Sequence, residues 1–156
     1  MKKLSGEGVR GMAQIEVPIY NGYIYVYFGD AKDCLEELRT MKGDEFAEAT
    51  ADFFKDSFDG KFVWSSNQRF FLLIVQQVPQ SLRDFGVVVH ELFHATYRFL
   101  ECKMLTLNDG SEESYAYFLQ YLFDEIMDYM VAQGNIIENE SKSPESGCLE
   151  VYPKLS

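Results

Sequence analysis

The segment from Ser81 to Leu105, "SLRDFGVVVHELFHATYRFLECKML", predicts the helix around which the domain is built. Ser81 and Asp84 stand three residues apart, in the arrangement of a capping box at a helix N-terminus. The apolar residues that follow occur on most faces of a helix of about 20 residues. We therefore expect this helix to be buried in the domain.

Both histidines of the chain, His90 and His94, lie in this segment. On an α-helix, residues four apart differ by only about 40° around the axis and about 6 Å along it, so both rings can reach one ion. Catalytic zinc favours such a set, completed by a third protein ligand and an open position for water. Glu91 is rotated about 100° from His90 around the helix axis, so it is not a direct ligand of the same ion. From that position its carboxylate can take a proton from the bound water and hand it to a leaving amine.

A structural reading of the same pattern needs no metal. Helices rich in aromatic residues often bury a histidine, and His-Glu-x-x-His also arises by chance. However, only two histidines are present, and burying them with Glu91 in "FGVVVHELFHATY" would cost a few kcal/mol for each unpaired polar group. A metal would offset that cost, so we expect a metal site.

The third ligand is expected to be a carboxylate, because the chain has no other histidine. Glu101 lies on nearly the same helical face, but about 16 Å along the axis from His90. Glu112 and Glu113 begin the next predicted helix, and the loop is long enough to return either to the ion. We favour Glu113 because the small Ala116 follows three residues later, where the two helices must approach closely; Glu112 would then point outward or support a histidine. Stabilisation of a helix N-terminus would also explain the acidic pair without a metal.

The rest of the chain predicts strands and helices that surround this helix. A β-hairpin is expected at roughly residues 13–20 and 23–28, with its turn at Asn21-Gly22. Amphipathic helices follow in "DAKDCLEELRTMKG" and "DEFAEATADFFKDSF". A second hairpin is expected in "GKFVWSSNQRFFLLIVQQVP", where "RFFLLIVQQ" is apolar enough to be a central strand.

After the histidine helix, "SEESYAYFLQYLFDEIMDYMVAQG" predicts a second long helix that folds back on the first. Residues 1–134 are expected to form a single domain. Residues 135–156 are polar and interrupted by Pro and Gly, which predicts a partly disordered tail in which "CLEVY" could add a short strand. The fold class is therefore α+β.

Composition excludes several classes of function. With 25 acidic and 14 basic residues the net charge is -11, which disfavours binding to nucleic acid or to anionic membranes. Cys34, Cys102 and Cys148 are odd in number and widely spaced, as is typical of reduced thiols. No apolar stretch of signal-peptide length follows the two N-terminal lysines, so a cytoplasmic location is expected.

Two motifs carry a resemblance to a known family. "VVVHELFHA" resembles the active-site helix of the zincin metallopeptidases whose third ligand is glutamate, and "EESYAYFLQYL" resembles the Glu-x-x-Ala helix of the ImmA/IrrE-type proteases of phages and mobile elements. The resemblance implies a minimal zincin-like fold, in which a small, mostly antiparallel sheet packs on the active-site helix and the following long helix. It implies that Zn2+ is bound by His90, His94 and Glu113, and that Glu91 acts as general base. It also implies that an edge strand, within residues 61–77, holds an extended peptide.

The expected function is that of a zinc-dependent peptidase acting on a peptide or protein substrate. The alternative is a catalytically silent zincin scaffold that binds a peptide or a partner protein. Tyr97, Tyr115 and Tyr117 are close enough in sequence to enter the cleft, but tyrosines in such positions more often belong to the core or its rim.

Overall fold

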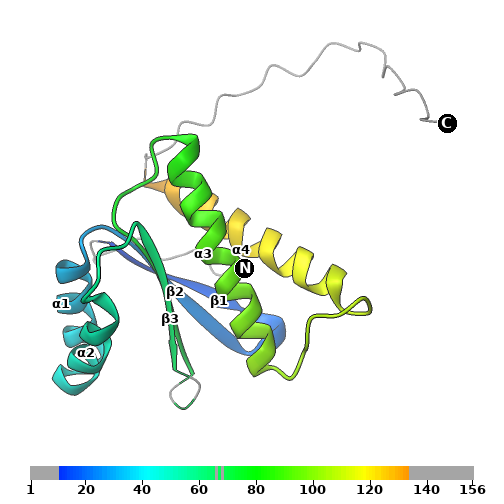
Figure 1. Ribbon diagram of the computed structural model, residues 1–156, viewed down its shortest axis with the longest axis horizontal. Coiled ribbons are helices and arrows are strands. Elements are labelled where there is room, and N and C mark those ends of the chain that lie inside the picture. Colours follow the sequence, from blue (N-terminus) through cyan, green and yellow to red (C-terminus); the bar gives the residue numbers. More distant parts are fainter. Residues whose placement is uncertain (1–10, 66, 68, 134–156) are drawn as a thin grey trace, which may run out of the picture.

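A four-stranded sheet lies between two layers of helices (Figure 1). The computed structural model describes residues 11–65, 67 and 69–133, so the predicted tail at 135–156 lies outside the described residues. The elements, in chain order, are β1 (Met12–Val17), β2 (Gly22–Phe28), α1 (Ala31–Lys42), α2 (Asp44–Ala51), β3 (Gly60–Ser65), β4 (Phe70–Val75), α3 (Leu82–Cys102) and α4 (Glu112–Ala132). None of the helices in this part of the chain is both long and apolar enough to cross a membrane.

The sheet has the order β1-β2-β4-β3 and is mixed. β1 pairs with β2 and β3 pairs with β4 in antiparallel hairpins, while β2 and β4 are parallel. All six residues of β4 are buried, which confirms the prediction that this apolar strand is central. β3 is left at the edge of the sheet. The α+β class predicted from the sequence is confirmed.

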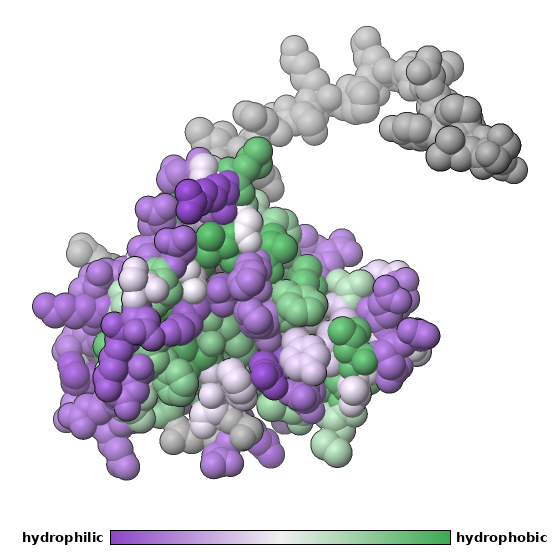
Figure 2. Space-filling model, in the orientation of Figure 1, coloured by the Kyte–Doolittle hydropathy of each residue, from purple (hydrophilic) through white to green (hydrophobic). Residues whose placement is uncertain are grey.

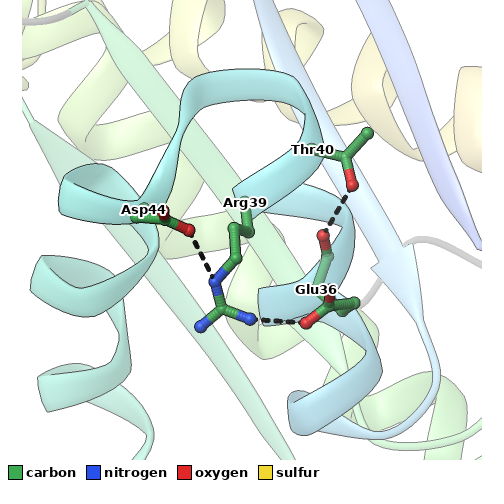
Figure 3. A network of polar contacts seen from close by, with 4 residues as sticks. All are labelled: Glu36, Arg39, Thr40 and Asp44. Atoms are coloured by element: carbon green, nitrogen blue, oxygen red, sulfur yellow. Dashed lines mark hydrogen bonds and ion pairs between the residues drawn. The ribbon is translucent and has the colours of Figure 1, made fainter.

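The first helical layer, α1 and α2, covers one face of the sheet (Figure 1). Cys34, Leu38 and Ala47 are buried against strand side chains of that face. The outer surface of the layer is polar: the Arg39 guanidinium contacts the carboxylates of Glu36 and Asp44, and its Nε lies 3.1 Å from Asp44 Oδ1 (Figure 3). Such exposed ion pairs contribute at most about 1 kcal/mol, so the buried side chains hold this layer in place.

The second layer, α3 and α4, covers the opposite face (Figure 1). α3 begins with the predicted capping box, in which the Asp84 backbone N–H donates to Ser81 Oγ and the Ser81 backbone N–H donates to the Asp84 carboxylate. Phe99 of α3 and Phe118 of α4 pack with ring centroids 5.2 Å apart. α4 thus folds back on α3, as the sequence predicts.

Two sequence expectations are wrong in detail. α3 is not buried on all sides: Val89 and Phe93 are 42% and 50% exposed, because the sheet and α4 cover only part of its circumference. The helix predicted in "DEFAEATADFFKDSF" ends at Ala51 and is followed by a 3-10 turn at Asp52–Phe54. The chain turns there so that Phe54 and Phe58 pack at the border of the α1 and α2 core.

Candidate active site

His90 and His94 lie side by side on the uncovered side of α3. Their Nε2 atoms are 3.2 Å apart, and the ring centroids are 4.9 Å apart at an interplanar angle of 73°. Two imidazole nitrogens bound to one tetrahedral zinc at about 2.0–2.1 Å would be about 3.3 Å apart. The pair therefore fits a shared zinc ion, and it fits equally a direct hydrogen bond between two neutral rings of opposite tautomers.

Both histidines are exposed. The expectation that they are buried, and that a metal must offset the cost of burial, is therefore wrong. The reason is the same as for Val89 and Phe93: this side of α3 faces neither the sheet nor α4. Figure 2 shows hydrophobic patches among polar side chains on the face of the molecule that it presents. A water-accessible histidine pair is, however, what an open coordination position would need.

Glu91 is the buried member of the motif, at 8% exposure. Its side chain lies against Gly60, the first residue of the edge strand β3. A Cβ atom at position 60 would lie 2.9 Å from Glu91 Cγ and 2.6 Å from Val87 Cγ1, so a larger residue could not occupy this position without displacing these two side chains. No motif of the sequence points to Gly60, although a glycine in a strand can signal close approach of another segment.

The surroundings of Glu91 act on its acidity in opposite directions. Burial raises the pKa of the Glu91 carboxyl, while the His90 and His94 rings, the Phe62 backbone amide and Lys61 lower it. Burial has the largest effect, so the net pKa is raised. A carboxylate whose pKa is raised is a better proton acceptor than an ordinary glutamate.

A shallow, open pocket of about 500 Å³ adjoins this motif. His90 and Glu91 line it together with the first turns of α3, and Asp59 and Gly60 line it from the start of β3. The pocket therefore lies between the histidine helix and the edge of the sheet. Farther along the same edge, Arg98 of α3 lies over the ring of the exposed Trp64, with 4.5 Å between the guanidinium carbon and the ring centroid.

Glu112 and Glu113 are exposed in the first turn of α4. That turn is near α3, since the rings of Tyr97 and Tyr115 are 6.2 Å apart, but within residues 11–65, 67 and 69–133 no three His, Cys, Asp or Glu side chains are arranged to hold one metal ion. The structure thus brings His90, Glu91 and His94 together and does not bring Glu113 to them. The role of Glu113 as third ligand stays a prediction.

The remaining candidates near the motif have structural contacts. Tyr115 is buried, and its hydroxyl donates to the Leu105 carbonyl at 2.6 Å, which ties α4 to the loop after α3. Glu101 is paired with Arg98 at 2.8 Å, as a surface ion pair. Tyr117 is largely exposed. None of these side chains is needed to explain the site.

Comparison of the chain with protein-family models, with curated proteins and with solved structures finds no match. The interpretation of the site therefore depends on the geometry of this chain and on the chemistry of its residues.

Proposed function

We propose that this protein is a zinc-dependent peptidase whose site is formed by His90, Glu91 and His94. One observation carries the proposal: two exposed imidazole nitrogens lie 3.2 Å apart, beside a carboxylate that is buried against the edge strand of the sheet. Both histidines are exposed, so packing in the core does not account for their presence.

His90 and His94 would hold the ion through Nε2, with Glu113 as the proposed third ligand. A zinc ion bound there would supply Lewis acidity, activating a water molecule and polarising the carbonyl of the bond to be cleaved. Glu91 would take the proton of that water and return it to the leaving amine. Its burial against Gly60 holds the carboxylate in place, and its raised pKa makes the carboxylate a better proton acceptor.

The edge strand β3 would bind the substrate. An edge strand presents backbone N–H and C=O groups that an extended peptide can pair with. β3 begins with Gly60 beside Glu91 and is the outermost strand next to β4, so a peptide added along it would pass the histidine pair. Cys34 and Cys102 are both free thiols, which supports the proposal that the protein acts in a reducing compartment such as the cytoplasm.

The second candidate is a catalytically silent scaffold that binds a peptide or a partner protein. It is favoured by one observation: in the described part of the chain no carboxylate joins the two histidines to complete a metal site. The two candidates share the edge strand and differ in the role of Glu91.

Glu91→Gln distinguishes them, with Glu101→Gln as the matched control on the same helix. We expect the wild-type protein loaded with zinc to cleave members of a mixed peptide library, as read by mass spectrometry. Glu91→Gln should keep its zinc and lose at least about 100-fold in cleavage rate, the usual contribution of general acid-base catalysis. Glu101→Gln should cleave like the wild type. Undiminished cleavage by Glu91→Gln would refute its role as base, and a zinc-loaded wild type that binds peptides without cleaving any would favour the scaffold.

Glu113→Gln and Glu112→Gln test the third ligand. Both residues are exposed in the same helical turn, so their effects on folding should be alike. Loss of a direct ligand should weaken zinc binding in Glu113→Gln by far more than in Glu112→Gln, measured by competition with a chromogenic chelator. Equal zinc affinities for the two variants would remove Glu113 from the site.

A further inference from the structure

Two glycines line the pocket beside the histidine pair: Gly60 at the start of β3 and Gly86 in α3. Their surroundings differ. A Cβ atom at Gly60 would lie 2.6 Å from Val87 Cγ1, so close packing of α3 on β3 favours a glycine there. A Cβ atom at Gly86 would meet no atom within 4 Å, and the residue is exposed. Packing therefore does not require a glycine at position 86.

Backbone conformation does not require Gly86 either. It lies within α3, and its φ is not in the positive range that favours glycine. The other six glycines of the described residues each have either a positive φ or a Cβ position within 3.4 Å of another group. Inside a helix, glycine is less favourable than alanine. Gly86 thus weakens α3 without a compensating role in packing or backbone geometry.

Gly86 lies in the same row of α3 as the two histidines. It precedes His90 by four residues, which is about 6 Å along the helix axis and about 40° around it. Both residues line the pocket, together with Glu91. An extended peptide advances about 3.3 Å per residue, so a peptide held at His90 has a side chain within about two residues that can reach Gly86. The missing side chain at position 86 leaves room beside the proposed metal site.

The other walls of the pocket indicate which side chain fits. Phe58 and Val87 are half-buried and apolar, whereas Asp59 and Arg83 are exposed and opposite in charge. An apolar side chain placed there gains free energy by leaving water, while the two opposite charges give no net preference for an acidic or a basic one. The volume of about 500 Å³ is within the usual range for binding pockets, so the pocket has room for an aromatic or a long aliphatic side chain.

We propose that Gly86 determines the specificity of the peptide site: because it lacks a side chain, it admits a large apolar side chain of the bound peptide into the pocket beside His90. The proposal rests on the proposed binding of a peptide along β3, which the peptidase and the scaffold share, and it does not require cleavage. It predicts that one substitution has opposite effects on two properties. A methyl group added at position 86 should stabilise the protein and weaken binding of peptides with large apolar side chains.

The test uses the full chain carrying Glu91→Gln and equilibrated with zinc, so that peptides are bound without being cleaved. The probes are fluorescein-labelled short peptides rich in Ser, Thr and Gln, in which one position is varied along the sequence. That position is Phe or Leu in the large-residue pool and Gly or Ala in the small-residue pool. Affinity is measured by fluorescence anisotropy, and stability by the melting temperature, with and without Gly86→Ala or Gly86→Leu.

The parent chain should bind the large-residue pool more tightly than the small-residue pool. Gly86→Ala should raise the melting temperature by about 2–4 °C, because alanine favours the helix. It should also weaken binding of the large-residue pool about fivefold, because the methyl group takes up space in the pocket, and leave the small-residue pool nearly unchanged. Gly86→Leu should weaken binding of the large-residue pool further, by at least about tenfold.

Two control variants separate the pocket from general effects on the helix. Gly60→Ala makes the same chemical change in the same pocket, but its methyl group meets Val87 and Glu91, so it should lower the melting temperature. Cys102→Leu enlarges an exposed side chain of α3 that does not line the pocket, so both affinities should stay as in the parent.

The proposal is overturned if neither pool binds, if Gly86→Ala binds the large-residue pool as tightly as its parent does, or if it loses both pools alike. A fall in the melting temperature of Gly86→Ala would also overturn it, since glycine would then be needed at position 86 for folding. Failure of the proposed peptidase is a separate result. A wild-type chain that binds the large-residue pool and cleaves none of it would refute the peptidase and leave the role of Gly86 standing.

Discussion

The two helical layers cover the same sheet but differ in what they leave exposed. Outside α1, the surface is mainly charged: Arg39 contacts Glu36 and Asp44, and Met41 is 40% exposed beside them. Outside α3, the surface includes two histidines, with the apolar Val89 and Phe93 beside them. The first layer therefore has an ordinary solvated surface, while the second exposes groups that contribute little to its own folding.

This difference separates residues that hold the domain together from residues that are free to bind something else. α3 has both kinds on one helix: Leu92 and Phe99 are buried in the core, and His90 and His94 point away from it. Substitutions on the two sides of α3, and in the two layers, should consequently have very different effects.

The largest effect on stability is expected for core truncations in either layer. Leu92→Ala in α3 and Leu38→Ala in α1 each remove a fully buried side chain and leave a cavity. Each should lower the free energy of unfolding by about 2–5 kcal/mol, as measured by urea denaturation. A cost below about 1 kcal/mol for either variant would show that its layer is not packed as described.

A smaller effect is expected at the start of α3. Ser81→Ala removes the side chain that accepts from the Asp84 backbone N–H. The free energy of unfolding should fall by about 1 kcal/mol, because only solvent replaces the lost cap. Asp84→Ala should act in the same direction, and its effect should fade in acid, since the capping bonds hold the pKa of Asp84 below its usual value. Stability from such a lowered pKa is present above the unfolded-state pKa and is lost as the pH falls.

The first layer contains one unfavourable group, Glu37 of α1. Its Oε2 atom is buried without a hydrogen-bond partner, and burial raises the pKa of the carboxyl. Because the folded-state pKa is raised, folding favours the protonated acid, and that contribution is lost as the pH rises through the folded-state pKa. Glu37→Gln should therefore raise the melting temperature at pH 7 and raise it less in acid. The corresponding gain in the free energy of unfolding at pH 7 should be less than about 1 kcal/mol. A larger gain in acid than at pH 7 would contradict this account of Glu37.

The smallest effect is expected for Leu82→Ala, ten residues before Leu92 on the same helix. Leu82 is 91% exposed, so its loss should change the free energy of unfolding by less than about 0.5 kcal/mol. The contrast between Leu82→Ala and Leu92→Ala uses one residue type on one helix and isolates burial as the cause. Similar losses of unfolding free energy for both variants would mean that Leu82 is buried as Leu92 is.

The sequence predicts the order of strands and helices well, because local signals specify them. Alternating residues and the Asn21-Gly22 turn predict the first hairpin, and the Ser81 capping box predicts the start of α3. The parallel pairing of β2 with β4 has no such signal, since it depends on how α1 and α2 pack between them. The exposure of α3 was missed for a related reason: apolar residues on most faces predict burial, but only packing decides which faces are covered.

The candidate site is predicted in part. The four-residue spacing of His90 and His94 places both rings together on any helix. The position of Glu113 depends on where α4 begins relative to α3, which helical spacing cannot specify.

Zinc content is the most direct test of the view that the exposed side of α3 is a metal site. The full chain is purified without chelators, equilibrated with zinc and desalted, and its metal is measured by elemental analysis alongside His94→Ala and Leu82→Ala. We expect about one zinc per chain in the wild type and in Leu82→Ala, and almost none in His94→Ala, with all three folded alike. Zinc-free wild-type protein, or equal zinc in His94→Ala, would contradict the account.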